Sequence, residues 1–232
     1  SAGQVYIPRL AVESFGGQFM AEGTYEIGDG TLKHPKFEIR LKNVAKLEEL
    51  MNQVPVPAQV KDFIASIKLE KPILNGVFNI DEADQNLDLT IDAESAEPTQ
   101  LPLPVEDISV ELKWSSGSGR LHFKNARASV ENRPLKAEGA VIFGPPVRMD
   151  FNLSGQRLPL NNKVLEWCGL DLKDWTAEGL CDVEMWADEW RPGGDTPAEF
   201  LENLDVGVKL RDLAVKHQEI GKIGRASCRE RV

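Results

Sequence analysis

The sequence predicts a mainly β fold: a curved, largely antiparallel sheet, groove-like or partly closed, with a few short amphipathic helices. Three observations predict it. Apolar and polar residues alternate in many runs, which is the two-residue period of a half-buried strand. Turn sequences such as Gly28-Asp29-Gly30 and Gly144-Pro145-Pro146 separate these runs. Few helical stretches intervene, which argues against a doubly wound α/β fold.

The alternating runs each have one apolar side and one wetter side, which is typical of an antiparallel sheet. A single sheet of this kind has to cover its apolar face. It can close on itself, pack on a second sheet, take a helical lid or hold acyl chains. The residues predicted to line this face are Phe37, Ile39, Leu41, Leu87, Leu89, Ile91, Ile108, Val110, Leu112, Val141, Phe143, Met149, Phe151 and Leu153.

Helical spacing interrupts the strands in a few places. Residues from about 44 to 68 predict an inserted pair of amphipathic helices, Val44–Val54 and Val60–Ile67, separated by a proline turn. A further helix is expected to begin at Thr196, where an N-cap, a proline and a capping-box glutamate follow one another. A shorter turn is expected from Asn161 through Trp167.

A short motif recurs at the start of three predicted strands. It reads Ala21-Glu22-Gly23, Ala137-Glu138-Gly139 and Ala177-Glu178-Gly179. Such repetition favours a hairpin unit that is added several times to a growing sheet. Glycine inside a strand often marks a bend or bulge, so we expect the sheet to curve at these positions.

The composition is that of a folded domain with an acidic surface. The chain has 232 residues, 41% of them hydrophobic, and a net charge of −10. That charge argues against general nucleic-acid binding, because phosphate contacts need a basic face. No apolar run reaches about 18 residues, so no membrane-spanning helix is predicted. Because the chain starts at Ser1 without Met and shows no signal-peptide pattern, we interpret it as a fragment of a longer protein.

The last ten residues, 223–232, differ from the rest in composition. One set of codons for them resembles a common short-read sequencing adapter translated in frame, so we interpret them as a non-native tail. They carry three Arg and one Glu, which leaves residues 1–222 with a net charge of −12. Residues 1–222 are then one β-rich region, and the tail is expected to show no regular pairing with the sheet.

The search for chemistry finds no catalytic motif and predicts no enzyme. The three histidines lie far apart, and no metal-binding, phosphate-binding or nucleophile motif occurs, so no metal or cofactor is predicted. Adjacent acid pairs such as Glu48-Glu49 are interpreted as solvated edges, because no pair stands out as glycosidase carboxylates. Cys168 and Cys181 are interpreted as two buried thiols, with a disulfide left open.

Four of the five tryptophans, at positions 167, 175, 186 and 190, lie in one window of the sequence. They are interpreted as core and loop anchors, with a carbohydrate platform or a membrane-interface belt as alternatives. Strict alternation puts Trp186 on the face of Asp182 and Glu184, but the register there is left open.

Four consecutive stretches carry a resemblance to a known family: Leu103–Trp114, Arg120–Glu131, Leu135–Phe143 and Val147–Ser154. They are similar to the AsmA-like superfamily of bacterial envelope proteins, which includes the TamB and YhdP groups. The shared rhythm is a strand, a strand ending near an acid, a short loop, a strand with A-x-G, and a strand of the V-x-M-D-F-x-L kind. Val5–Leu41 looks similar. The resemblance is one of strand pattern and not of signature residues. The family has no catalytic motif, so no site residues are carried over to this chain.

The resemblance implies a periplasmic β-groove segment, attached to the inner membrane through a region absent from this chain. Its partners would be phospholipid acyl chains and other envelope proteins, with no nucleic acid. It would support phospholipid transport to the outer membrane, or assembly of that membrane. Two alternatives remain: a non-catalytic structural or adhesive β scaffold with a closed core, and a carbohydrate-binding module with its tryptophans and acids on one exposed face.

Overall fold

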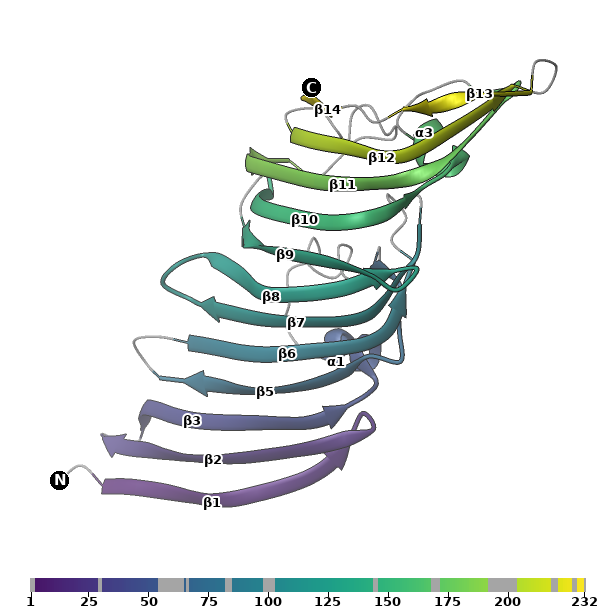
Figure 1. Cartoon of the computed structure of the whole chain (residues 1–232). Helices are drawn as coiled ribbons and strands as arrows, with labels where there is room; N and C mark the ends of the chain where they lie inside the picture. The colour runs from purple at the N-terminus through teal and green to yellow at the C-terminus, as the bar shows by residue number, and fades with distance from the viewer. Residues whose placement is uncertain are drawn as a thin grey trace.

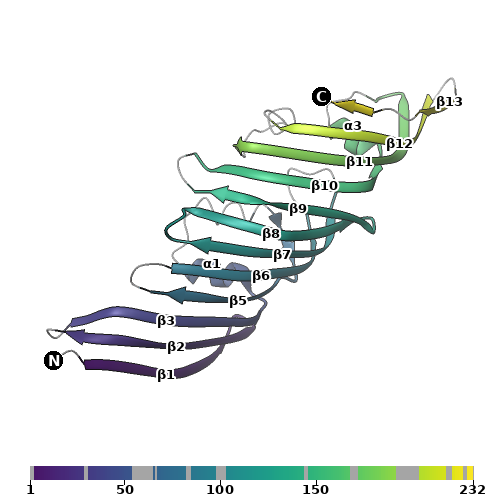
Figure 2. The ribbon, with the colours of Figure 1, turned by 60° about the vertical axis from the view of Figure 1, so that its left-hand side comes forward.

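The computed structural model describes residues 3–28, 31–53, 65, 67–81, 85–97, 103–143, 146–167, 172–191, 204–217, 221–226 and 229–231. These residues form one open antiparallel sheet and two short helices, so the prediction of a mainly β fold is confirmed. The strands follow one another in a single layer from β1 at one end to β12 near the other (Figures 1 and 2).

The helices are α1 (Leu47–Gln53) and α3 (Asn162–Trp167). The strands are β1 (Gly3–Ser14), β2 (Gly17–Gly28), β3 (Thr31–Val44), β4 (Leu69–Glu70), β5 (Ile73–Ile80), β6 (Gln85–Ala96), β7 (Val105–Ser115), β8 (Arg120–Val130), β9 (Arg133–Ile142), β10 (Arg148–Leu160), β11 (Trp175–Trp190), β12 (Asp205–His217), β13 (Gly221–Ala226) and β14 (Arg229–Arg231).

The topology is an up-and-down meander, because each strand of the main path pairs with its neighbours in sequence. β4 is the exception near the middle. It pairs with the end of β6, through Leu69 opposite Ala96, and so continues the line of β5 along the same partner. Sequential pairing keeps every strand contact local along the chain, which follows from the short turns between the alternating runs.

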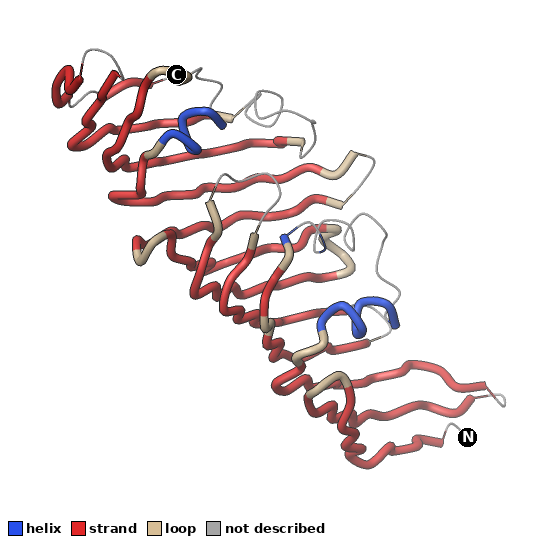
Figure 3. The backbone as a smooth tube through the Cα atoms, turned by 90° about the vertical axis from the view of Figure 1, so that its right-hand side faces the viewer, coloured by secondary structure: helices blue, strands red, loops and turns tan. Residues whose placement is uncertain are grey.

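Bulges interrupt several strands at residues with positive φ. The register shifts between Leu41 and Val44, between Phe123 and Ala126, and between Gly155 and Leu158. The positive-φ residues at these points are Asn43, Asn125 and Arg157. A bulge inserts one extra residue and bends the strand. Several strands change direction partway along their length in Figure 3, as bulges require.

Side chains from neighbouring strands satisfy the backbone N–H groups of three bulge residues. The N–H of Asn43 donates to Asn75 Oδ1 at 2.9 Å, and the N–H of Arg157 donates to Asp182 Oδ1 at 3.0 Å. The N–H of Glu189 donates to Asp150 Oδ1 at 2.8 Å. At a bulge these N–H groups no longer face a carbonyl of the paired strand. A carboxylate or amide oxygen of a neighbouring strand accepts their hydrogen bonds instead.

The glycines of the A-x-G motifs lie beside large neighbours. A Cβ atom added at Gly23 would lie 2.4 Å from Phe37 Cδ1, and one at Gly139 would lie 2.7 Å from Phe123 Cζ. At Gly179 the nearest atom would be Leu213 Cα at 2.9 Å. The missing side chain therefore leaves room for the adjacent strand and its aromatic or aliphatic residue. Close approach between strands is the physical reason for these glycines in the structure.

A small core lies where α1 packs on the sheet. Val44, Leu47, Leu74 and Ile91 are buried there, at 0, 6, 2 and 7% exposure. Leu50, the next apolar residue of the helix, is half-buried against them. The first predicted helix is thus present but begins at Leu47, because Val44 still belongs to β3. The predicted helix from Val60 and the one from Thr196 lie mainly or wholly outside the described residues.

Asn161 caps α3, which coincides with the short turn predicted from Asn161 through Trp167. Its side chain Oδ1 accepts a hydrogen bond from Val164 N at 3.2 Å, three residues into the helix. Asn162 then ties the helix to β11, accepting from Ala177 N at 2.8 Å and donating to Trp175 O at 2.9 Å. Neither described helix has the length and apolar character needed to cross a bilayer.

The expectation that residues 223–232 would show no regular pairing is wrong. β13 pairs with β12, with Ala226 opposite Leu213, and β14 pairs with the same strand, with Arg231 opposite Gly207. The free edge of β12 offers a row of backbone N–H and C=O groups that any following segment can pair with, whatever its side chains. Because this pairing does not depend on where the segment comes from, the non-native origin of residues 223–232 stays a prediction.

Candidate functional site: an apolar sheet face and two polar hollows

One face of the sheet is apolar from β1 to β12. Residues directly opposite each other in neighbouring strands share a face, so the register can be followed across the sheet. One cross-strand row runs through Phe19, Leu41, Gly76, Leu89, Leu112, Phe123, Gly139, Phe151 and Ala187. The next row runs through Ala21, Ile39, Phe78, Leu87, Trp114, Leu121, Val141, Met149 and Trp190.

The structure brings the predicted lining residues together on this apolar face. Eight of the fourteen stand in strict register in the two rows given above, and a ninth stands in the next row. Leu41, Leu89, Leu112 and Phe151 belong to the first row, and Ile39, Leu87, Val141 and Met149 to the second. Phe37 stands opposite Gly23 and Ile80 in the row beyond.

The remaining predicted residues lie on the other side of the first row, apart from one. Leu74, Ile91 and Val110 stand in one line, as do Ala137, Leu153 and Met185, and Ile108 stands opposite Ala93. Phe143 lies just past the paired end of β9, and its N–H donates to Gly119 O at 3.2 Å. The role of these residues in holding lipid stays a prediction.

Most of this face is only half-buried. Among the fourteen predicted residues, Ile91 and Val141 are buried, at 7% exposure each, and the other twelve keep intermediate exposure. In the part of the chain that the structure describes, all strands belong to one sheet, so no second sheet packs on the apolar face. A closed sandwich would bury these residues on both sides.

The apolar face divides into a covered part and an uncovered part. We call the area around α1 the covered part: Leu41, Leu89, Val110 and Leu112 pack there against the buried cluster of Val44, Leu47, Leu74 and Ile91. A second small cluster of Ala96, Val105 and Val130 takes in Ile108. We call the area on β8–β11 around Phe123, Phe151, Leu153 and Met185 the uncovered part, because these four lie outside both clusters.

Several residues of the apolar face were missing from the sequence prediction. Phe19, Phe78, Phe123 and Met185 stand in the same rows as the predicted residues. Their strands break the alternation, because a bulge or a glycine interrupts the pattern on one side. Between Phe123 and Ala126 the alternation of apolar and polar residues shifts by one position. Asn125 is a sequence signal for this shift, because asparagine tolerates positive φ.

The opposite face is polar and carries ion pairs between strands. Lys113 Nζ lies 2.8 Å from Asp88 Oδ2, and Arg148 lies 2.6 Å from Glu189. Arg211 donates to Asp182 Oδ2 from Nε at 2.7 Å and from a terminal nitrogen at 2.5 Å. These bonds, together with the one from Arg157 N, hold the pKa of Asp182 below its ordinary value.

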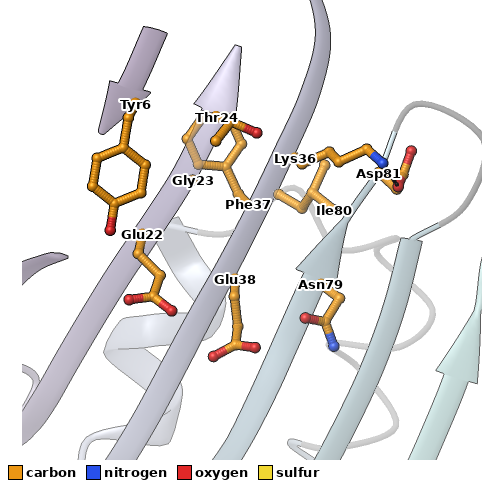
Figure 4. Close-up of a pocket in the computed structure, with 10 residues that line it drawn as sticks. All are labelled: Tyr6, Glu22, Gly23, Thr24, Lys36, Phe37, Glu38, Asn79, Ile80 and Asp81. Carbon is orange, nitrogen blue, oxygen red and sulfur yellow. Dashed lines mark ion pairs between the residues drawn. The ribbon is translucent and has the colours of Figure 1, made fainter. Parts of the chain in front are cut away.

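A first hollow, of about 350 Å³, lies across β1, β2, β3 and the end of β5 and has both polar and apolar lining residues (Figure 4). Lys36 and Asp81 form an exposed ion pair of 3.4 Å at one side of it. Glu22 and Glu38 stand opposite each other in register, and Arg40 bonds to Glu38. Glu38 is the main cause that raises the pKa of Arg40 above its ordinary value. Tyr6, which is 65% exposed, lies at the β1 side.

The tryptophans of the predicted cluster separate in space. Trp190 is buried on the apolar face, with its ring edge-to-face with Phe151 at a centroid distance of 5.6 Å. Trp175 is 36% exposed and packs edge-to-face with His217 at 4.7 Å. Trp186 is 44% exposed and stands on the polar face, in register with Asn152 and Asp205. The side chain of Trp167 lies outside the described residues.

The other chemistry-bearing residues stay apart. Among the residues with described positions, no three His, Cys, Asp or Glu side chains group in a way that could hold a metal ion. Cys181 is buried, at 3% exposure, and Cys168 lies outside the described residues. His122 is on β8 and His217 at the end of β12, while the side chain of His34 is not described.

Comparisons with known proteins give no relative. A scan against protein-family models, a search of the curated proteins and a search of the solved structures each found no match. The AsmA-like resemblance therefore stays a prediction.

Proposed function

We propose that the chain shelters phospholipid acyl chains on its apolar sheet face, as a periplasmic groove segment of a bacterial envelope protein. In this role it supports phospholipid transport to the outer membrane, or assembly of that membrane. The proposal keeps the AsmA-like interpretation, with attachment to the inner membrane through a region outside this chain. Its partners are acyl chains and other envelope proteins, not nucleic acid, and it performs no catalysis.

The observation that carries the proposal is the uncovered part of the apolar face. Phe123, Phe151, Leu153 and Met185 come from β8, β10 and β11 and share the apolar face, yet they are only half-buried. A contiguous apolar surface that keeps partial exposure is a candidate interaction site. Acyl chains suit it, because each buried CH₂ group contributes about 0.8 kcal/mol without needing any special residue.

The shape of the sheet supports the proposal further. Bulges bend the strands, and the bent paths in Figure 3 favour a groove-like curvature of the open sheet. α1 packs on the apolar side of the sheet, at one part of it only. We propose that it serves as a partial lid, with acyl chains occupying the part that it leaves open.

The charge of the chain fits tails better than headgroups. The net charge of −10 repels anionic headgroups, so these are expected to stay in water while the tails contact the sheet. The charged residues lie on the opposite face, as the pairs Asp88–Lys113 and Asp182–Arg211 do. The apolar and charged surfaces are thus divided between the two faces of one layer.

The covered cluster favours a second candidate, a non-catalytic structural or adhesive β scaffold. Val44 and Leu74 are 0 and 2% exposed, so this part of the sheet already has a packed core. A scaffold needs no ligand, and the uncovered part would then meet another protein. The two candidates differ in whether lipid accompanies the purified chain.

The test compares two substitutions on adjacent residues of β10. Leu153→Asp puts a carboxylate on the apolar face, while Ser154→Asp puts the same charge on the polar face, where Ser154 stands opposite Lys136 and Glu184. Extracted phospholipid is measured by mass spectrometry after detergent-free purification. We expect lipid with the wild type and with Ser154→Asp, and at least a fivefold loss with Leu153→Asp. Wild-type chain without lipid would favour the scaffold.

A further inference from the structure

A second hollow lies over β8–β12, mainly among side chains of the polar face, and Phe123, Gly139, Phe151 and Ala187 of the first apolar row also border it. Its volume is about 820 Å³. Gly139 and Ala140 contribute to its lining, and Ala140 is only 5% exposed, so short side chains keep it open. Around them stand Arg120, His122, Glu138, Asn152, Trp186 and Asp205.

Trp186 presents a flat aromatic surface in this hollow. The side chain is 44% exposed, although indole is costly to leave in water. A Cβ atom at Gly207 would lie 3.7 Å from Cζ3 and 3.8 Å from Cη2 of the indole, so the six-membered ring lies beside the bare backbone of β12. The glycine lets the ring lie close to the sheet, with the rest of the indole exposed to solvent.

Polar side chains flank the indole in register. Glu138, Asn152, Trp186 and Asp205 stand opposite one another in four consecutive strands. Directly opposite residues have Cβ atoms about 4.5–5.5 Å apart, so Asn152 and Asp205 lie immediately on either side of Trp186. Asn152 offers both donors and acceptors, and the two carboxylates offer acceptors only.

The charges around the hollow limit what it can hold. Two basic side chains, Arg120 and Lys124, stand against four carboxylates, at Glu138, Asp150, Asp188 and Asp205. Asp150 is already engaged, since it accepts from Glu189 N and lies 3.8 Å from Arg120. An excess of carboxylates repels phosphates, nucleotides and acidic sugars. Neutral or positively charged ligands remain.

We propose that this hollow binds an oligosaccharide made of neutral or amino-bearing sugars, with one ring stacked on Trp186. The apolar side of a pyranose ring suits an exposed indole, and its hydroxyl groups suit flanking amide and carboxylate groups. An open, shallow site across five strands accommodates an extended chain of sugars. The sheet would then hold a glycan on one face and acyl chains on the other.

The experiment uses the full 232-residue chain and three probes: chitotriose, its fully deacetylated form with three glucosamine units, and maltotriose. Binding is measured by calorimetry and by the change in tryptophan fluorescence. Trp186→Ala should weaken binding of the best probe by about tenfold or more, because stacking on an aromatic ring is the main contact. Trp186→Phe should retain most of the affinity.

Two controls separate the site from general effects. Trp175→Ala removes another exposed tryptophan of β11, one that packs on His217 outside the hollow, and should leave affinity unchanged. Leu153→Asp, on the other face, should also leave it unchanged. Asp205→Asn should weaken the glucosamine trimer more than chitotriose, because only the former carries ammonium groups. Binding by none of the three sugars, or equal loss in Trp175→Ala and Trp186→Ala, overturns the proposal.

Discussion

The two halves of the apolar face beside the first row have different environments. Val44, Leu74 and Ile91 form the half beneath α1 and are 0, 2 and 7% exposed. Ala137, Leu153 and Met185 form the half on β9–β11 and are all half-buried. Both halves have the same alternation and the same face of the sheet. The difference is that Leu47 and Leu50 of α1 pack on the first half only.

This contrast shows that an apolar sheet face is not in itself a core. Alternation decides which face a residue takes, but a partner from elsewhere in the chain decides whether that face is buried. The covered part uses its apolar residues for stability. The uncovered part keeps comparable residues available, which is what a binding surface requires.

The largest expected effect is on stability in the covered part. Leu74→Asp places an unpaired charge at a 2% exposed position and should lower the free energy of unfolding by about 3–5 kcal/mol. Leu153→Asp, in the uncovered part, should cost about 1 kcal/mol or less, because water can reach the new carboxylate. Urea denaturation followed by circular dichroism gives both values. Similar losses would abolish the distinction between the two parts.

Val110 lies between these extremes. It stands opposite Ile91 and packs against the cluster beneath α1, while keeping intermediate exposure. Val110→Asp alone therefore does not distinguish a packed sandwich from a lipid groove. The pair Leu74 and Leu153 separates the two cases, because each residue belongs clearly to one part of the face.

A smaller loss is expected at Gly139, where the strands approach closely. A Cβ atom there would lie 2.1 Å from Asp150 O and 2.7 Å from Phe123 Cζ. Gly139→Ala should therefore destabilise the fold by about 1–3 kcal/mol, as overpacked positions do. Gly117 is the matched control, since its Cβ would meet only Ser115 Oγ, at 3.9 Å. Thermal unfolding that is unchanged in Gly139→Ala would contradict the close approach.

The smallest effect concerns Asp182, which binds Arg211 and the bulge at Arg157. Its pKa is lowered in the folded chain, first by Arg211 and then by the backbone of Arg157. A lowered pKa contributes stability above the unfolded pKa, and that stability is lost as the pH falls through the folded pKa. Arg211 is 41% exposed, so screening by water limits the contribution to about 1 kcal/mol.

Asp182→Asn should therefore be less stable than wild type at pH 7, and the difference should shrink below about pH 4. Urea midpoints measured from about pH 3 to about pH 7 provide the test. Asp88→Asn, which breaks a more exposed pair with Lys113, should show almost no difference at either end. A gap for Asp182→Asn that is constant with pH would rule out the carboxylate charge as its cause.

The strands and their faces could be predicted from the sequence because a two-residue period needs only local information. Ile39, Leu89 and Val141 all take the expected face. The bulges could not be located in this way, since one extra residue at Asn43 or Asn125 changes the phase of the pattern. A prediction of strict alternation therefore holds within a run and fails across a bulge.

The covering of the apolar face and the pairing of the tail depend on contacts between distant segments. Alternation within a strand does not indicate which part of the apolar face a helix will cover. The sequence therefore did not show that α1 packs near Leu74 and Ile91, with Leu153 outside that cluster. Likewise, the composition of residues 223–232 says nothing about the free edge of β12, with which β13 and β14 pair as strands. Trp186 could be placed on the polar face only once the register of β11 was known.

The most direct test of the central claim asks where an acyl chain touches the sheet. The photoreactive amino acid p-benzoylphenylalanine is placed at Leu153 in one variant and at Ser154 in another, and each chain is irradiated with phosphatidylethanolamine vesicles. The two positions are adjacent in β10 but stand on opposite faces. We predict phospholipid crosslinks, detected by mass spectrometry, from position 153 and few or none from position 154. Equal crosslinking at both positions, or none at position 153, would contradict the account.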